Sequence, residues 1–399
     1  MAKGYGMTWA KTFVLAVSAI LSVATLPLPV AEAADFDIVP KVAASWQYDS
    51  NYFLADRNER PVFTYLLQPG IDVGIQTAKS SVKLDYTLNA YWYDDRDTVP
   101  PLERDASDDD YVGHTFDLQM RYQAFTRLQF GLDNLYLLTR DPAQSDAFSD
   151  SILRLKYHLN ALTPFLVYEF GPKFNVAARY RNTQINYVDT DIGDSDENRG
   201  IFDLIYNLNS RNSIDLQYQY WQKNYDVGTD YTSNQVKLIF RRQMRAFDII
   251  VGGGYQNRKF DDSDLGDIGA FTYNIAIDGE ILEKRRAYAT LRAEQNLNDQ
   301  SFSADYFIAT RFSLSGGYEF TSKLSAGALA YYQISDYQLT SRKDKTFTVS
   351  GNLNYRLARW MALNMAVGYE NRDSNINGLN YDNTFVIASL NFFYELGRK

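Results

Sequence analysis

The strongest constraint in this sequence is an alternation of apolar and polar residues with a period of two. In residues 81–97, SVKLDYTLNAYWYDDRD, every second side chain is apolar, namely Val82, Leu84, Tyr86, Leu88, Ala90 and Trp92. Six alternations in a row predict a β-strand with one apolar and one polar face. In a soluble sandwich the apolar face would form the core. In an outer-membrane barrel it would contact lipid, and the polar face would line a lumen.

The same alternation returns along the whole chain after residue 34. It predicts about eighteen strands, with about sixteen as the lower bound. They lie near residues 36–48, 62–76, 81–93, 113–124, 128–139, 159–170, 174–187, 200–209, 213–225, 233–241, 246–260, 270–282, 287–297, 306–320, 324–335, 345–357, 361–371 and 383–396.

The connections between these strands alternate in length. Short turns such as TAKS (77–80), GPK (171–173) and TSK (321–323) alternate with long segments such as 94–113, 188–198 and 261–270. Short periplasmic turns and long extracellular loops are typical of an up-and-down membrane barrel. The sequence therefore predicts an all-β fold, a closed antiparallel transmembrane β-barrel of about eighteen strands.

The first 33 residues have the pattern of a secretory signal peptide. Lys3 and Lys11 precede an apolar run from about Phe13 to Leu26, and Ala31-Glu32-Ala33 is the expected cleavage motif. We therefore expect a signal peptide over 1–33 and a barrel over 34–399, located in the outer membrane of a Gram-negative bacterium. Because the chain has no cysteine, the stability of the barrel must come from strand pairing and burial.

Charged and aromatic residues distinguish the two ends of the predicted barrel. Residues 94–110 hold eight acids and two arginines, whereas the short turns carry lysines and arginines. Aromatic side chains are expected in two rings at the membrane interfaces. The ring near the long loops comprises Tyr48, Trp92, Tyr225, Tyr255, Tyr332 and Tyr369, and the ring near the short turns comprises Tyr122, Phe174, Phe247, Phe320, Tyr355 and Trp360.

The last predicted strand alternates apolar residues and ends in aromatics. It is much like the carboxy-terminal signal read by the outer-membrane assembly machinery, although it runs on to Lys399. The expected partners are this machinery, outer-membrane lipid and lipopolysaccharide. No feature of the sequence indicates nucleic acid as a partner.

Following the alternation through each strand assigns many charged residues to the inner face. A charged side chain facing lipid at the midplane costs about 2–4 kcal/mol, so their confinement to one face indicates a watery lumen. These side chains would either create a transverse field that orients polar solutes or pair with one another and fill the interior. The predicted pore-lining residues are Lys83, Asp85, Asp117, Arg121, Arg179, Arg181, Asp248, Arg258, Arg292, Glu294, Arg311 and Arg356.

Some inward aromatic residues are candidates for stacking on sugar rings, with interior packing as the alternative. They are Tyr91, Tyr93, Trp221 and Tyr331. The acidic segments 189–197 and 262–267 loosely resemble calcium loops but lack the ligand spacing of an EF-hand, so no metal site and no cofactor are predicted. The only histidines are His114 and His158, and no G-x-S-x-G, H-E-x-x-H or phosphate-loop motif is present. We therefore expect that the protein is not an enzyme.

The start of the mature chain resembles β-barrel porins of the BBP2 type. The likeness rests on a Tyr-Asp-Ser-Asn turn at residues 48–51, a strand containing Pro69-Gly70, a Lys-Ser turn and a Leu-x-Tyr strand. The resemblance, which includes barrels of the EpsL and VpsM types, implies an outer-membrane barrel involved in exopolysaccharide export. Polysaccharide or periplasmic export proteins would then be further partners.

Three functions remain open from the sequence. The first is a porin-like channel, which could be the outer-membrane component of an exopolysaccharide system. The second is a plugged structural or adhesive barrel that binds a partner through its acidic extracellular loops. The third is a soluble all-β binding protein.

Overall fold

The computed structural model describes residues 35–95, 104–149, 151–262, 264–280, 286–300 and 305–394. The predicted signal peptide and residues 96–103 of the acidic loop lie outside these ranges. Among the described residues, no helix is long and apolar enough to cross a membrane.

Eighteen antiparallel strands make up a single sheet. Their bounds are β1 (Asp35–Asp49), β2 (Val62–Gln76), β3 (Ser80–Asp95), β4 (Tyr111–Phe125), β5 (Leu128–Thr139), β6 (Tyr157–Glu169), β7 (Phe174–Tyr187), β8 (Ser195–Asn209), β9 (Asn212–Tyr225), β10 (Tyr231–Gln243), β11 (Phe247–Phe260), β12 (Asp267–Glu280), β13 (Ala287–Asp299), β14 (Tyr306–Glu319), β15 (Leu324–Tyr337), β16 (Lys343–Ala358), β17 (Met361–Ser374) and β18 (Tyr381–Phe393). Within the described ranges, two short 3-10 helices, η2 (Ala106–Asp109) and η3 (Pro142–Gln144), lie in long connections.

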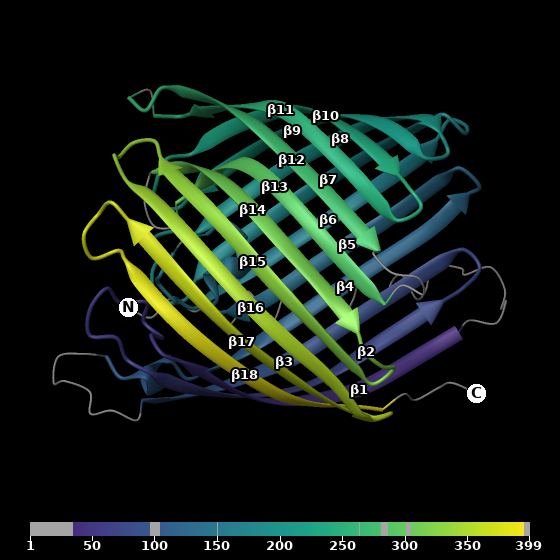
Figure 1. Ribbon diagram of the computed structural model, residues 1–399. Helices are drawn as coiled ribbons and strands as arrows, with labels where there is room; N and C mark the ends of the chain where they lie inside the picture. Colours follow the sequence, from purple (N-terminus) through teal and green to yellow (C-terminus); the bar gives the residue numbers. More distant parts are fainter. Residues whose placement is uncertain are drawn as a thin grey trace, which may run out of the picture.

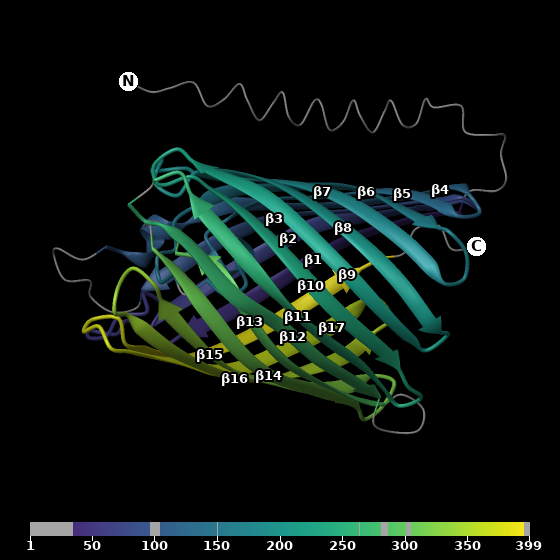
Figure 2. The ribbon, with the colours of Figure 1, turned by 90° about the horizontal axis from the view of Figure 1, so that it is seen from above.

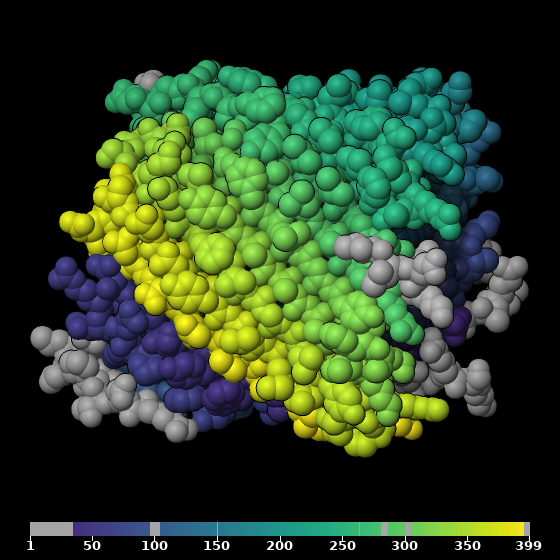
Figure 3. Space-filling model, viewed as in Figure 1, coloured from purple at the N-terminus to yellow at the C-terminus, as the bar shows by residue number. Residues whose placement is uncertain are grey.

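The sheet closes on itself through its first and last strands. Each strand pairs with its neighbours in sequence, and β1 pairs with both β2 and β18. The strands wrap at a tilt around a common axis (Figures 1 and 2), and Figure 3 shows one outer face of the resulting wall. This confirms the predicted closed up-and-down barrel and its strand number.

The closing seam explains part of the Tyr-Asp-Ser-Asn turn. Asn51 is fully buried, and its Nδ2 donates to the carbonyl oxygens of Ala55, at 2.9 Å, and Asp382, at 3.0 Å. The backbone N–H of Asn51 donates to Oδ1 of Asn383 at 3.0 Å. A single amide side chain therefore ties the β1–β2 loop to β18 at the long-loop end of the barrel.

The outer face of the barrel is apolar. Residues paired directly across two antiparallel strands point to the same side of the sheet, so the pairing identifies one continuous outer face. On this face Leu238, Leu291 and Leu314 are about half exposed. Such an exposed apolar surface requires a lipid cover, which agrees with the predicted lipid-facing set in β3, where Trp92 is 47% exposed.

The two aromatic rings are present with one error. Trp92, Tyr255, Tyr332 and Tyr369 are exposed at the long-loop end, and the residues expected near the short turns include the exposed Trp360. Tyr225 was expected in the outer ring, and this is wrong. The outward residues of β9 carry even numbers, as the exposed Tyr218 and Tyr220 show, so Tyr225 points inward and donates a hydrogen bond to Asp299.

Strand ends differ from the sequence prediction mainly at β8. This strand begins at Ser195, whereas the alternation predicted a start near residue 200. The outward residues Asp196 and Asn198 are polar and bond to Asn182 of β7. Strand pairing therefore continues past the apolar band, where alternation no longer marks it.

Candidate functional site: the lumen and the elements folded into it

All twelve predicted pore-lining residues lie on the face of the sheet opposite the exposed apolar side chains. The strand register places each of them on the inner side, and ion pairs join several to neighbouring strands. The register thus turns all twelve inward, although Arg258 is packed and only 2% exposed, and their role as pore-lining residues stays a prediction.

Inner side chains in the strand halves next to the short turns form what we call the turn-side zone. Here charged residues form partly exposed pairs. The Nη1 of Arg121 lies 2.6 Å from Oδ1 of Asp133, with side-chain exposures of 33% and 40%. Lys41 bridges Asp72, at 2.6 Å, and Asp85. The Arg121–Asp133 and Lys41–Asp72 pairs are accessible to water. Asp203 and Asp215, in the same zone of β8 and β9, are each 2% exposed and paired with Arg179 and Arg241.

The turn-side zone and the middle of the barrel are unevenly charged around the wall. On β2–β5 the inward carboxylates Asp72, Asp85, Asp117 and Asp133 outnumber the inward cations Lys83 and Arg121. On β7–β10 cations outnumber acids. The inward cations there are Arg179, Arg181, Arg199, Lys237 and Arg241, and the inward acids are Asp203 and Asp215. The lumen therefore has an acidic sector and a basic sector, which is the arrangement a transverse field requires.

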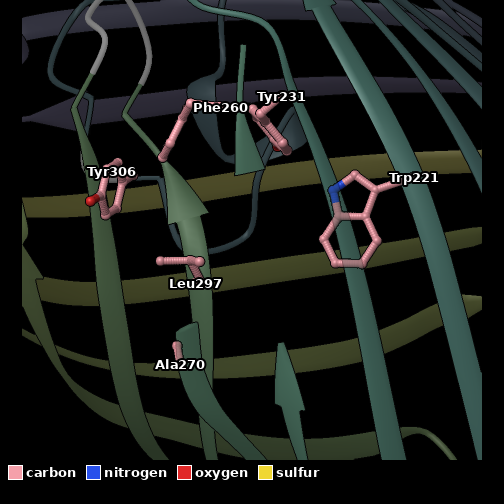
Figure 4. Packing of buried hydrophobic residues seen from close by; sticks show 6 residues of the cluster. All are labelled: Trp221, Tyr231, Phe260, Ala270, Leu297 and Tyr306. Atoms are coloured by element: carbon pink, nitrogen blue, oxygen red, sulfur yellow. The ribbon is translucent and has the colours of Figure 1, made fainter. Parts of the chain in front are cut away.

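Inner side chains in the strand halves next to the long loops form the loop-side zone, and this zone is packed. Tyr157, Tyr231 and Phe307 are 3% exposed or less, and Arg258 is 2% exposed. Figure 4 shows one of these clusters, made of Trp221, Tyr231, Phe260, Ala270, Leu297 and Tyr306. Two elements folded inward from the rim produce this packing.

The first inward element is the segment 140–156 between β5 and β6, which we call the crossing loop. It starts at the end of β5, where Nη1 of Arg140 lies 2.8 Å from Oδ1 of Asp109 in η2, the 3-10 helix between β3 and β4. Its tip reaches β14 and β15, because the carbonyl of Ala147 accepts from Arg311 at 2.6 Å and that of Phe148 accepts from Gln333 at 3.1 Å. Since β5 and β14 lie on opposite sides of the eighteen-stranded ring, the segment spans the lumen.

The second inward element is the end of the β13–β14 hairpin. Pairing of β12 with β13 stops at Tyr273 and Gln295, although both strands continue. Beyond this point the Asp299 carboxylate lies over β9–β11. It accepts from Lys223 at 2.7 Å and Tyr231 at 2.8 Å, and Arg258 lies 2.7 Å away. The end of the hairpin has therefore parted from β12 and folded over β9–β11, while β14 stays paired with β15 up to Phe307.

The two inward elements meet inside the barrel. Phe148 from the crossing loop packs with Phe307, Ala309 and Tyr337, which belong to β14 and β15. The guanidinium of Arg311 lies 4.5 Å from the centre of the Phe148 ring and 4.8 Å from that of Tyr331. Together these contacts form a constriction near the long-loop end.

The candidate sugar-stacking residues lie at or beside this packing. Tyr93 and Trp221 are buried, and the guanidinium of Arg199 covers the Trp221 ring at 4.3 Å. Tyr91 stacks on Tyr111 with ring centres 4.7 Å apart. Tyr331 lies beside Arg311. In this conformation the four rings make packing contacts, as the alternative interpretation of interior packing expects.

Sequence reasoning missed both inward elements. The crossing loop carried a usable signal, because the apolar Phe148 and the cations Arg140 and Arg154 are unusual in a solvated loop. The β13–β14 hairpin gave no such signal, since its strands continue the alternation up to the point where they leave the wall.

The histidines lie on the outer face. Nδ1 of His114 is 2.9 Å from the hydroxyl of Tyr86, and Nδ1 of His158 is 2.9 Å from that of Tyr136. Among the residues that the structure describes, no group of three or more His, Asp or Glu side chains could hold a metal ion.

Comparison with known proteins agrees with this architecture. Residues 250–393 match the family described as "Putative beta-barrel porin 2". The resemblance to β-barrel porins of the BBP2 type is thus confirmed, but on β11–β18 and not on the first strands, where its motifs were found, and the likeness to the EpsL and VpsM types stays a prediction. No curated protein matches the chain in sequence.

Solved structures share the fold at low sequence identity. OccAB4 of Acinetobacter baumannii is 14% identical with a TM-score of 0.51, over 91% of this chain and 98% of that one. OccAB2 of the same organism is 10% identical with a TM-score of 0.50, over 90% and 98%. The outer membrane protein opdK of Pseudomonas aeruginosa is 13% identical with a TM-score of 0.49, over 91% and 99%. The chain therefore shares the closed β-barrel fold of OccAB4 and OccAB2.

Proposed function

We propose that the protein is a passive outer-membrane channel for small polar solutes, with its selectivity set in the lumen. The observation that carries this proposal is the set of water-accessible ion pairs on the inner wall of β1–β5 in the turn-side zone. Partly exposed ion pairs such as Arg121–Asp133 add little to stability, so a purely structural interior has little need of them. A polar solute, by contrast, needs charged and hydrogen-bonding groups along its path.

The constriction would set the size limit of this channel. The crossing loop and the β13–β14 hairpin narrow the lumen at the long-loop end, where a solute enters from outside. Both elements are held by side-chain contacts, such as Arg311 with Ala147, and not by strand pairing across the lumen. They can therefore be loosened by mutation without opening the barrel wall.

A plugged barrel is the second candidate, and the packing of the loop-side zone favours it. In that case the protein would act as a scaffold whose acidic loops bind a partner. Part of the main acidic loop, residues 96–103, lies outside the described residues, so binding of divalent cations or a partner there stays a prediction.

Planar-bilayer recording of the purified full chain tests both candidates. We expect a small, reproducible conductance step for the wild type and a larger step when the tip of the crossing loop, residues 142–149, is replaced by a short glycine–serine link. A silent wild type with a conducting variant would identify a plugged barrel. Silence of both proteins, with the barrel shown to be folded by its heat-dependent gel mobility, would contradict a channel.

A role in exopolysaccharide export rests on the resemblance to the EpsL and VpsM types alone. A gene neighbourhood encoding glycosyltransferases and a chain-length regulator would support it. Polysaccharide and periplasmic export proteins as partners, and recognition of the last strand by the assembly machinery, likewise stay predictions.

A further inference from the structure

We propose that the strand ends of the β13–β14 hairpin have two positions, and that the thickness of the bilayer sets the balance between them. The parts that move are residues 296–299 of β13 and 306–308 of β14. In the inner position, which the structure shows, they lie inside the lumen over β9–β11. In the wall position, β13 pairs with β12 along its full length. The inference rests on the proposed function only where it predicts conductance.

The first argument is an unfilled place in the sheet. β12 pairs with β11 as far as Asp267, and β13 pairs with β14 as far as Asp299. The two strands pair with each other only up to Tyr273 and Gln295. Nε2 of Gln295 donates to the carbonyl of Phe271 at 2.8 Å, so the backbone groups of Phe271 face β13. The edge of β12 thus offers hydrogen-bonding groups that a strand partner would use.

The second argument is that the sequence of β13 fits the wall. Continuing the observed register gives the pairs Thr272–Asn296, Phe271–Leu297 and Ala270–Asn298. Leu297 would then point outward beside Phe271, which is 57% exposed, and the asparagines would point into the lumen. This is the apolar-out, polar-in pattern of a wall strand. In the inner position Leu297 instead packs on the inside of the wall and is 6% exposed (Figure 4).

The third argument is that β14 keeps the hairpin attached to the wall. Phe307 of β14 is paired with Tyr337 of β15, and Ile308 of β14 is paired with Leu297 of β13. The two strand ends therefore turn about β14 as one unit. The observed strand pairs are kept in both positions.

Side-chain contacts hold the inner position. The Asp299 carboxylate accepts from Lys223 at 2.7 Å and lies 2.7 Å from Arg258. The ring of Tyr306 stacks on that of Phe260 with centres 5.2 Å apart. In the wall position a strand ladder replaces these contacts, and water that fills the vacated space solvates the two cations. Both positions thus satisfy their polar groups, as an element with two discrete arrangements requires.

The wall position adds a row of apolar side chains to the outer face. Leu297 and Ile308, which now pack in the inner cluster, would continue the lipid-facing surface beside Phe271. Mismatch between the apolar height of a protein and the bilayer costs free energy. A thicker bilayer should therefore favour the wall position, and a thinner bilayer the inner position.

The test is chemical cross-linking with the shortest bis-methanethiosulfonate reagent, because the chain has no cysteine of its own. The reporting pair is Phe271→Cys with Leu297→Cys, whose side chains lie on opposite sides of the sheet in the inner position and side by side in the wall position. Ile277→Cys with Leu291→Cys is the positive control, because these residues are directly paired on the outer face. Phe271→Cys with Leu291→Cys, on the outer face but out of register, is the negative control.

We expect the reporting pair to cross-link about tenfold faster than the negative control, and about tenfold faster again with Asp299→Ala, but not with Asp278→Ala. The rate should be higher in vesicles of dieicosenoyl-phosphatidylcholine than of dimyristoleoyl-phosphatidylcholine, with the positive control unchanged. A reporting pair no faster than the negative control, even with Asp299→Ala, would overturn the wall position. Equal rates in the two lipids would overturn the coupling to thickness.

Hydrogen exchange of variants that keep Leu297 gives a second measurement. In the wall position the amides of residues 267–272 gain strand partners. Asp299→Ala should therefore slow their exchange relative to wild type in the same lipid, whereas Asp278→Ala should not. Faster exchange of these amides in Asp299→Ala would contradict the wall position, because it would mean that the hairpin end had only loosened.

Conductance separates this inference from the channel function. The cross-linked reporting pair should conduct more than the wild type, and reduction of the link should reverse the gain. Cross-linking in an electrically silent barrel would support the wall position and contradict the channel. An open channel in which the reporting pair never cross-links would overturn the wall position and leave the proposed function standing.

Discussion

The two halves of the lumen use the same kinds of residues in opposite ways. In the turn-side zone, Arg121 and Asp133 pair while remaining 33% and 40% exposed. In the loop-side zone, Arg258 pairs with Asp299 at 2.7 Å while only 2% exposed, enclosed by tyrosine and phenylalanine rings. The first arrangement keeps a wall wet and charged. The second holds the inward-folded hairpin in place. The same ion-pair chemistry therefore occurs on a hydrated wall where the pair is exposed and in a packed contact where it is buried.

The largest expected effect comes from removing the central carboxylate of the loop-side zone. Asp299→Ala leaves Arg258 and Lys223 without their shared counter-charge, so the free energy of unfolding should fall by about 3–5 kcal/mol. Urea titration in detergent micelles, followed by fluorescence, measures this. Asp278→Ala is the control, because Oδ1 of Asp278 lies 3.9 Å from Nη2 of Arg292 and both side chains are exposed. This substitution should lower the free energy of unfolding by less than about 1 kcal/mol. Similar losses in both variants would remove the distinction between the zones.

The second effect concerns the tip of the crossing loop. Phe148→Ala removes the ring that packs on Phe307 and Tyr337, and should weaken the seating of the loop by about 2 kcal/mol, because the loop can relax around the gap. Proteolysis within residues 140–156 should accelerate, and the single-channel conductance should rise. Phe130→Ala is the control, since Phe130 lies on the outer face of the adjoining strand β5 and is 42% exposed. Unchanged proteolysis in Phe148→Ala would show that the tip does not hold the loop.

A smaller effect is expected from pH. Burial, and next the nearby Asp299 carboxylate, raise the pKa of Asp146 in the crossing loop above its ordinary value of 3.8. A raised pKa means that the seated loop favours the protonated acid. The contribution of protonated Asp146 to the stability of the seated loop is complete below the ordinary pKa and is lost as the pH rises through the raised value. Conductance should therefore increase as the pH is raised from acid, and Asp146→Asn should abolish this dependence. A pH profile that Asp146→Asn leaves unchanged would assign it to another group.

The smallest effect is expected in the turn-side zone. Arg121→Gln breaks a partly exposed pair, so stability should change by less than about 1 kcal/mol, while the lumen loses one cation from its acidic sector. Reversal potentials in a KCl gradient should shift toward cation selectivity. A large loss of stability here would mean that this zone, too, is a packed structural interior.

The sequence predicted the features that repeat from strand to strand, and it missed contacts that occur only once in the fold. The alternation fixes which face of each strand meets lipid, so it gave the strand number and the inward placement of residues such as Arg121 and Arg311. Contacts between distant segments have no period. Tyr225 and Asp299 are 74 residues apart, and nothing in the pattern of β9 indicates that they meet.

One motif behind the family resemblance also gains a physical reason. A Cβ at Gly70 would lie 2.6 Å from the backbone oxygen of Tyr86 and 2.9 Å from Cε of Lys41. Gly70 therefore leaves room for Lys41 to reach Asp72 and Asp85. The sequence shows the glycine, but only the closed barrel places Lys41 of β1 against it.

The early separation of β13 from β12 also bears on how deep the barrel sits. Above Tyr273 the edge of β12 no longer has β13 alongside, and Nε2 of Gln295 donates to the carbonyl of Phe271 at 2.8 Å in place of a strand partner. Peptide groups without such partners are not tolerated within hydrocarbon. The hydrocarbon core of the membrane must therefore end near this level. The point where β12 and β13 part thus marks its outer boundary on the barrel wall.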